Sequence, residues 1–357
     1  MLSSMEYILS AQHPQNLPYY RCNPAQRLKP SQRAKHDFTM KKLLCSLAIL
    51  MAAGVSLSAQ QEAHYTQFMY NKLFINPAYA GARGVPSLTA IYRNQWMGFD
   101  GAPQSMLASF NGPFLSKRVG IGVNVSHMKV GLQRDFQASL AYSYDVVAQE
   151  NVSLRIGLSG SLRSLGFAYN EAQPAQSGDL SIEDQRINDF YGNVGAGVYG
   201  TIMEQYYFGV SVPRLYSNAI GLTNGSATTL AKEYQHFYGM AGAIIPLSED
   251  INLMPAMLLK YVKNAPFDAD LNINLDIKQK VTAGLSYRLG GDGRGESVGL
   301  LAFWQAAPQF GIGAAYDFTL SSLKDYNSGS FELMLQYDLK QLNDSKKRKM
   351  SNPRFFM

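Results

Sequence analysis

The stretch Val152-Ser-Leu-Arg-Ile-Gly-Leu-Ser-Gly-Ser-Leu-Arg163 places an apolar side chain at nearly every second position. Successive side chains of a β-strand point to opposite faces, so this period of two predicts a strand with one apolar and one polar face. The pattern recurs throughout the chain after residue 87. Further clear cases are residues 119–127, 136–146, 271–278, 281–289 and 331–339. Residues 87–340 are therefore predicted to form an all-β domain.

The length of these segments and of their connections favours a membrane barrel over a soluble sandwich. Many segments reach about ten residues, which a tilted strand needs to cross a bilayer. Connections that alternate short and long are typical of outer-membrane barrels. Short links are expected at 112–117, 148–151, 203–205, 247–250, 278–280 and 306–309, and longer ones at 98–104, 129–135, 166–189, 213–235, 263–270, 290–296 and 321–329. This spacing predicts about 14 antiparallel strands, short periplasmic turns and periplasmic termini.

Charged residues within the segments indicate which face meets lipid. An Arg or Lys side chain facing the middle of a bilayer costs roughly 2–4 kcal/mol. The positions opposite the apolar rows are therefore expected to line a polar lumen; they include Arg93, Asp145, Arg155, Arg163, Asp276, Arg288 and Glu332. Candidate lumen-facing residues are Arg93, Gln95, Arg155, Arg163 and Arg288. An interfacial aromatic girdle is expected to include Tyr142, Tyr144, Tyr206, Tyr287 and Tyr337.

The first 59 residues have the properties of a leader. Met40-Lys-Lys42 precedes an apolar run and a small-residue region ending at Ala59, which predicts a secretory signal peptide at 40–59 with cleavage next to Ala59. Residues 1–39 are polar, and we expect them to be an upstream extension with Met40 as the true start. The two cysteines, Cys22 and Cys45, both lie in this leader, which leaves no thiol for disulfides or zinc binding.

Net charge does not point to nucleic acid. The chain has a formal charge of +6, with 32 basic and 26 acidic residues. Residues 1–59 hold seven of the basic and two of the acidic residues, so 25 basic and 24 acidic residues remain, a net charge of +1. A nearly neutral mature chain gives no electrostatic support for binding DNA or RNA.

A distinct segment, residues 60–86, precedes the strands. Its apolar residues recur at intervals of three and four, which predicts a short amphipathic helix that ends at Asn76-Pro77. We expect the segment to begin on the periplasmic side, to pack inside or beneath the lumen and to turn at Asn76-Pro77 into strand one. Its candidate plug or partner-contact residues are Tyr65, Gln67, Phe68, Met69, Leu73, Phe74, Asn76, Pro77, Tyr79 and Gly81. Both a structural plug and a gate or partner surface are open interpretations.

Motifs for chemistry are weak. Gly195-Ala-Gly-Val-Tyr-Gly200 matches a dinucleotide fingerprint, but it lies within an alternating strand and no βαβ unit surrounds it. The glycines are therefore interpreted as small residues in the barrel wall. His64, His127 and His236 have no neighbour at metal-site or catalytic spacing. The sequence predicts a non-enzymatic protein without a cofactor.

The basic C-terminal tail, residues 341–357, is expected in the periplasm. It is either a solvated end or a docking peptide, in which basic residues approach an acidic partner and the two Phe side chains bind in a pocket. The candidate docking residues are Lys346, Lys347, Arg348, Arg354, Phe355 and Phe356.

One segment resembles a known family. Tyr65-Thr-Gln-Phe-Met-Tyr-Asn-Lys-Leu-Phe-Ile-Asn-Pro-Ala-Tyr-Ala-Gly81, followed by Tyr92-Arg-Asn-Gln-Trp96 and Pro103-Gln-Ser105, resembles the start of the PorP/SprF family. Asn352-Pro-Arg-Phe-Phe356 is similar to the family's C-terminus. Members are outer-membrane proteins of the type IX secretion and gliding machinery of Bacteroidetes.

The resemblance implies a barrel that supports export or surface attachment of cargo with a C-terminal sorting domain. It also implies as partners the periplasmic ring lipoproteins, an OmpA-like peptidoglycan-binding protein and a separate translocon barrel. A transport barrel for small or hydrophobic solutes, like porins or fatty-acid channels, is the alternative function. A soluble periplasmic β protein is a third hypothesis.

Overall fold

The structure is a computed structural model of the chain. It describes residues 63–168, 186–221, 229–263, 265–290 and 295–339. The chain divides into two compact units, Met1–Val55 and Ser56–Met357, and every described residue belongs to the second. Among the described residues there is no helix with the length and apolarity needed to cross a bilayer.

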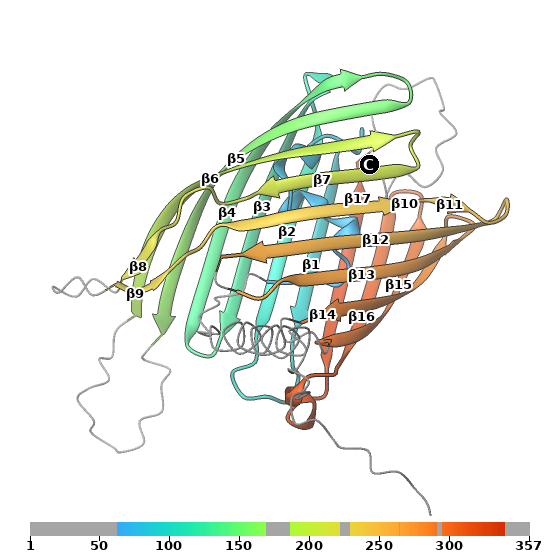
Figure 1. Cartoon of the computed structure of the whole chain (residues 1–357). Coiled ribbons are helices and arrows are strands. Elements are labelled where there is room, and N and C mark those ends of the chain that lie inside the picture. The colour runs from blue at the N-terminus through green and yellow to red at the C-terminus, as the bar shows by residue number, and fades with distance from the viewer. Residues whose placement is uncertain (1–62, 169–185, 222–228, 264, 291–294, 340–357) are drawn as a thin grey trace, which may run out of the picture. The chain divides into compact units, whose positions relative to one another are not determined.

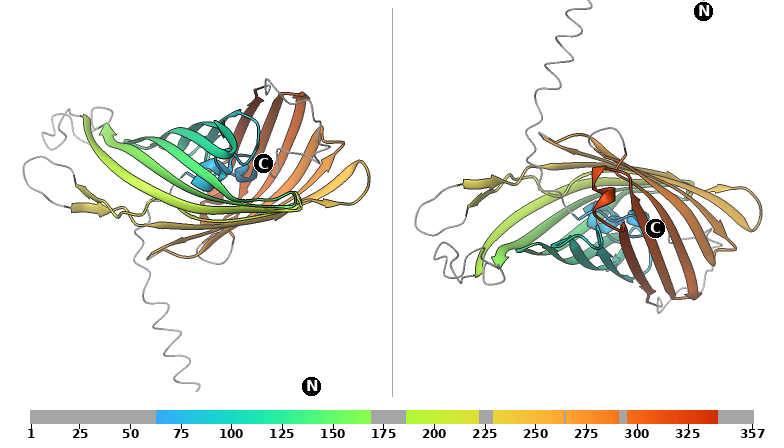
Figure 2. Two further views of the ribbon diagram at one scale, coloured as in Figure 1. Left: turned by 90° about the horizontal axis from the view of Figure 1, so that it is seen from above. Right: turned by 90° about the horizontal axis from the view of Figure 1, so that it is seen from below.

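The described part of the second unit is a closed antiparallel β-barrel (Figures 1 and 2). Within the described residues, fourteen strands pair in a ring, which confirms the predicted fold class. Their bounds are β1 (Ser87–Asn94), β2 (Gln104–Phe114), β3 (Ser116–Val130), β4 (Gln133–Ala148), β5 (Val152–Ala168), β6 (Arg186–Ile202), β7 (Tyr206–Val212), β10 (His236–Ala243), β12 (Ile251–Val262), β13 (Asp268–Ile277), β14 (Val281–Leu289), β15 (Ser297–Ala307), β16 (Phe310–Thr319) and β17 (Ser330–Asp338).

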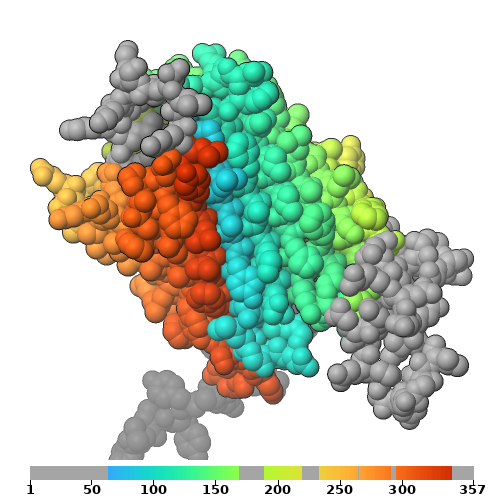
Figure 3. Space-filling model, turned by 180° about the vertical axis from the view of Figure 1, so that it is seen from behind, coloured from blue at the N-terminus to red at the C-terminus, as the bar shows by residue number. Residues whose placement is uncertain are grey.

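Two pairings close the ring. β1 pairs with β17, with Ser87 opposite Asp338, and the red and blue strands lie side by side in Figure 3. β10 pairs with both β7 and β12. Three short strands are additional to these fourteen: β8 (Ala219–Gly221) pairs with β9 (Thr229–Lys232), and β11 (Ile245–Pro246) follows β10 and pairs with β12. In addition, η5 (Ser322–Asp325) is a 3₁₀ turn in the loop before β17.

The two faces of the wall differ as the period of two predicts. On β5, Leu158 and Leu162 are 64% and 69% exposed on the outer face, whereas Arg155 and Arg163 are buried inside. The tyrosines expected in the girdle are all exposed; they are Tyr142, Tyr144, Tyr206, Tyr287 and Tyr337. An apolar outer face suits lipid, since polar groups there would lose their water without gaining partners.

The connections define two ends of the barrel. The end that we call the short-turn end carries links of one to four residues between consecutive strands, including Leu115 between β2 and β3 and residues 278–280 between β13 and β14. The opposite, long-loop end carries residues 95–103 and 320–329. These links lie where the sequence predicted them.

One predicted long link is wrong. Residues 129–135 were expected to form a loop, but β3 runs to Val130 and β4 starts at Gln133, so only Gly131 and Leu132 connect them. Lys129 pairs with Arg134 in the ladder. The sequence predicted a loop because these residues are mostly polar. A strand that extends beyond the membrane into water can be polar on both faces, so its sequence does not differ from that of a loop.

The burial pattern generates a depth-dependent prediction. Leu140, at the middle of β4, is 60% exposed, and Val146, near the short-turn end of the same strand, is 44% exposed. Leu140→Arg should lower the free energy of unfolding in lipid vesicles by about 2–4 kcal/mol, and Val146→Arg by about 0–1 kcal/mol, because lipid headgroups and water solvate a charge near the interface. Urea titration measures both. Equal losses at the two depths would contradict this placement of the bilayer.

Candidate functional site: the plug segment inside the barrel

Residues 63–86, here called the plug segment, lie within the ring of strands (blue in Figure 2). They form three 3₁₀ turns: η1 (Phe68–Tyr70), η2 (Lys72–Phe74) and η3 (Pro77–Tyr79). Of the ten candidate plug residues, nine are buried and Phe74 is partly buried; they are Tyr65, Gln67, Phe68, Met69, Leu73, Phe74, Asn76, Pro77, Tyr79 and Gly81. The structure therefore brings all ten into the barrel interior.

The predicted amphipathic helix is wrong in detail. Asn71, between η1 and η2, has a non-helical φ of −133° and ψ of 67°, and Asn76 is extended before Pro77. Both side chains bind the barrel instead: Asn71 Nδ2 donates to Ser109 Oγ at 2.9 Å, and Asn76 Nδ2 donates to the Val198 carbonyl at 2.9 Å. Apolar residues three positions apart share one side of a 3₁₀ turn too, so the spacing did not separate a helix from a series of turns.

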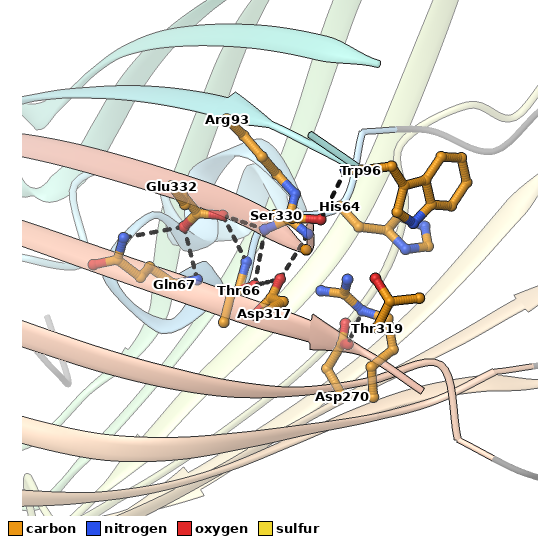
Figure 4. A network of polar contacts seen from close by, with 12 residues as sticks. His64, Thr66, Gln67, Arg93, Trp96, Asp270, Asp317, Thr319, Ser330 and Glu332 are labelled. Carbon is orange, nitrogen blue, oxygen red and sulfur yellow. Dashed lines mark hydrogen bonds and ion pairs between the residues drawn. The ribbon is translucent and has the colours of Figure 1, made fainter. Parts of the chain in front are cut away.

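A charged cluster holds the start of the plug segment (Figure 4). Glu332 accepts hydrogen bonds from the backbone N–H groups of Thr66 and Gln67, at 2.9 and 3.0 Å. Arg93 binds Glu332 at 3.1 Å and Asp317 at 2.7 Å. Thr66 Oγ1 donates to Asp317 at 2.7 Å and accepts from Arg93 at 3.0 Å. We call these five residues the Arg93 cluster.

A second charged group lies at the same end of the barrel. Asp270 accepts from Arg288 at 2.6 Å and lies 2.5 Å from Lys260. His64, at the start of the plug segment, lies 3.6 Å from Asp268. Charges from β12, β13 and β14 thus surround the first described residues of the plug segment.

The last residues of the plug segment contact a different part of the barrel from the first ones. The Gly81 N–H donates to Asn111 Oδ1 at 2.6 Å, and Arg83 binds Asp338 at 2.8 Å. The Leu339 N–H then donates to the Pro86 carbonyl at 2.9 Å, directly before β1. These contacts join the segment to the short-turn end.

The plug segment therefore runs through the barrel. Glu332 is the third residue of β17 and Asp338 is its last, so the two attachment points lie roughly 20 Å apart along the strand at about 3.3 Å per residue. The expectation that the segment begins on the same side as the first strand is wrong, because Thr66 and Gln67 lie at the long-loop end. Asn76-Pro77 is not the turn into strand one either, since it starts η3 and β1 begins only at Ser87.

The inner wall is shaped to receive the backbone of the plug segment. A Cβ atom added at Gly120 would lie 2.1 Å from the Ala80 carbonyl oxygen, and one at Gly157 would lie 2.3 Å from the Ala78 nitrogen. Gly197 is the middle glycine of the fingerprint-like motif, and a Cβ atom added there would lie 2.1 Å from Asn76 Oδ1. Only glycine permits this close approach, because it has no Cβ atom. Packing against the plug segment therefore explains these glycines, and nucleotide binding is not needed to explain them.

The lumen is not uniformly polar, contrary to expectation. One side presents aromatic and sulfur-containing side chains to the plug segment. Tyr70 stacks on Phe303 at 4.8 Å between ring centroids, and Tyr79 meets Tyr199 edge-on at 5.2 Å. Lys72 is fully buried, with its amine 4.3 Å from the centre of the Tyr207 ring. The apolar residues of the plug segment thus have a core of their own inside the barrel.

A small cavity lies beside the plug segment. The interior cavity next to η1 and η2, lined by Tyr65, Phe68, Phe74, Tyr238 and Leu258 among others, is about 20 Å³. That volume is about enough for one water molecule. Within the described residues, no group of three or more His, Cys, Asp or Glu is placed to hold a metal ion.

The remaining predicted residues lie in separate places. Arg155 lies 3.5 Å from Asp145, and Arg163 binds Asp135 and Glu233, the latter at 2.6 Å. Neither belongs to the Arg93 cluster. Gln95 is half-buried beyond the end of β1, where its N–H donates to the Pro103 carbonyl at 2.9 Å. The six candidate tail residues lie outside the described residues.

Sequence reasoning missed Thr66, Asp317, Asp270 and Lys260 as site residues. A signal for Asp317 was present, because it lies between outward-facing Tyr316 and Phe318 on an alternating strand. For Thr66 there was no such signal, since its role depends on which strands the plug segment meets.

Comparison with known proteins finds a family match and similarity to solved structures. Residues 57–337 match the family described as type IX secretion system membrane protein PorP/SprF. No curated protein matches the chain in sequence. Among solved structures, the CymD monoaromatic hydrocarbon channel is similar at 10% identity and a TM-score of 0.47, covering 81% of this chain and 97% of that one. A Pseudomonas aeruginosa FadL homologue is similar at 14% identity and a TM-score of 0.41, covering 80% and 96%.

Breaking the Arg93 cluster should release the plug segment. Met69 is fully buried, and Cys22 and Cys45 both precede residue 60, so Met69→Cys in a protein that starts at residue 60 provides a single reporter thiol. Adding Glu332→Ala leaves Arg93 and two backbone N–H groups without this acceptor, a loss of roughly 3–5 kcal/mol for a broken buried pair. We expect a soluble maleimide to label the thiol at least roughly tenfold faster in this variant.

Glu332→Gln is the matched control, because its amide oxygen still accepts a hydrogen bond from the plug backbone while the charge is lost. Its labelling rate should fall between those of the other two proteins. Equal rates in three folded, heat-modifiable proteins would show that the cluster does not hold the segment.

Proposed function

The chain belongs to the PorP/SprF family of type IX secretion system membrane proteins, and we propose that it is a non-conducting, non-enzymatic barrel acting through protein contacts. In this proposal it supports the export or surface attachment of cargo that carries a sorting domain. Its proposed partners are that cargo, the periplasmic ring lipoproteins and an OmpA-like peptidoglycan-binding protein. The barrel resides in the outer membrane, with the short-turn end proposed to face the periplasm.

The observation that supports this proposal is the way the lumen is occupied. The plug segment is attached at both ends of the barrel, by Thr66 and Gln67 at one end and by Arg83 at the other. The attachment at Thr66 and Gln67 includes a buried charge pair and the one at Arg83 a partly buried charge pair, and the loss of either partner leaves an uncompensated charge. A solute channel needs a continuous polar or apolar path, and a segment attached in this manner obstructs one.

The alternative function, a transport barrel for small or hydrophobic solutes, requires the plug segment to move. The polar contacts of Asn71 and Asn76 with the wall, together with the close approach at Gly120 and Gly157, oppose such movement during ordinary fluctuation. A surface offered to partners is compatible with a fixed plug, because partners would bind the ends of the barrel. The basic tail at 341–357 is a further proposed periplasmic contact.

Planar bilayers separate the two functions. The parent protein should show no steady conductance, whereas the double variant Arg93→Ala/Glu332→Ala should open channels with roughly tenfold higher probability, because the plug segment has lost its attachment at the long-loop end. Glu332→Gln should stay closed for most of the time. Steady conductance by the parent protein would favour the transport function.

Removal of the gene tests the secretion role directly. Surface proteolysis and mass spectrometry of intact cells should show that at least one cargo protein with a sorting domain is lost from the surface and accumulates in the periplasm. The parent gene supplied in trans should restore it. Unchanged surface cargo together with reduced uptake of a hydrophobic solute would overturn the proposal in favour of the alternative.

A further inference from the structure

The barrel wall is interrupted where β7 ends. β7 has seven residues, and its last pairs are Val212 with Ala196 of β6 and Ser211 with Tyr238 of β10. Pro213 follows, and it lacks the N–H group that would continue the ladder. β6 extends ten residues further towards the long-loop end, from Ala196 back to Arg186, without β7 beside it.

The chain after Pro213 only partly covers this interruption. The Leu215 N–H donates to the Val194 carbonyl at 2.9 Å, and Asn193 exchanges hydrogen bonds with Tyr216 at 2.7 and 3.0 Å. These bonds tie the chain to β6, and Gln235, directly before β10, donates to the Leu215 carbonyl. Among the described residues, no strand pairs with β10 on this side beyond Tyr238. In Figure 1, β6, β7, β10 and β12 follow one another around this part of the wall.

A hollow of about 570 Å³ lies at this position on the outer wall. Its floor is formed by small or branched residues, including Ala196, Val198 and Gly239. Phe237, Tyr261 and Phe267 stand at its edge and are 44%, 50% and 56% exposed. The Phe237 and Tyr261 rings are 6.1 Å apart between centroids.

The space above the floor at Gly239 is not filled by neighbouring described side chains. Among the described residues, the neighbour within 4 Å of a Cβ atom placed at Gly239 is the Leu259 side chain, at 3.8 and 4.0 Å. By contrast, a Cβ at inward-facing Gly242 would lie 2.4 Å from Tyr207. Gly239 therefore leaves room for part of another molecule.

The chemistry of the lining indicates what that molecule is. Apart from the tyrosines, the polar side chains among the described lining residues are Ser211 and Lys260, which are both buried and face inward. Ser211 donates to the Ile75 carbonyl, and Lys260 binds Asp268 and Asp270. The surface turned outward is apolar and continuous with the lipid-facing wall, where Val210 is 60% exposed. The volume lies within the range of small-molecule sites.

We propose that this hollow binds one acyl chain of an outer-leaflet lipid. An apolar hollow that faces the bilayer is filled by lipid hydrocarbon, because no polar group in it requires water. Three aromatic rings border the hollow, and a linear acyl chain can lie between them. The site lies at the long-loop ends of β7, β10 and β12, which corresponds to the outer leaflet in the orientation proposed above, with the short-turn end facing the periplasm. The site would hold one lipid against the wall, in contrast to the exchanging lipids around the rest of the barrel.

Photo-crosslinking tests the proposal on the full mature protein. The protein is reconstituted in vesicles of phosphatidylethanolamine that contain a small fraction bearing a diazirine in one acyl chain, and labelled residues are mapped by mass spectrometry. We expect labels to concentrate on Val210, Phe237 and Tyr261. Gly239→Trp, which fills the floor, should reduce these labels at least fivefold.

Leu285→Trp is the matched control, because Leu285 is 58% exposed on the outer face of β14, away from the hollow, and the label should not change. Ala196→Leu provides a second, milder filling variant if Gly239→Trp does not fold. Labels spread evenly over the exposed wall would overturn the proposal. A link from the hollow to a second protein chain would overturn it too, since it would identify a protein as the occupant.

Discussion

Glu332 accepts hydrogen bonds from two successive backbone N–H groups of the plug segment while Arg93 neutralises its charge, and the interior of the barrel depends on this arrangement. A carboxylate inside a barrel wall is costly to desolvate unless it is fully paired. Thr66 and Gln67 supply donors, and Arg93 supplies the opposite charge. The plug segment and the wall therefore supply hydrogen-bond and charge partners to each other at this point.

The same dependence applies along the whole segment. At Gly120 and Gly157 the wall leaves space for the plug backbone. Tyr70 and Tyr79 of the plug segment pack against Phe303 and Tyr199 of the wall. Because the segment enters at one end and leaves at the other, the strands have to close around it or be threaded by it. This arrangement supports the proposal that the barrel acts through protein contacts.

Much of the barrel was predictable because the bilayer imposes simple rules. The alternation in β5, the short links such as 278–280 and the number of strands follow from the cost of polar groups in hydrocarbon and from the tilt of strands. The rules failed where a segment leaves the membrane. Polar residues around Gly131 looked like a loop, although the β3 and β4 ladder continues through Lys129 and Arg134 into water.

The sequence by itself predicted which face of the strands meets lipid, that Arg93 and Glu332 point inward and that the segment before the strands packs inside or beneath the lumen. Period-two patterning and apolar spacing are local properties, so they can be read without knowing the neighbours. Only the tertiary structure decided that this segment crosses the lumen from the long-loop end, that it forms 3₁₀ turns and that Asp317 joins Thr66. Those features depend on contacts between residues up to 266 positions apart, and such pairings arise only when the ring of strands closes.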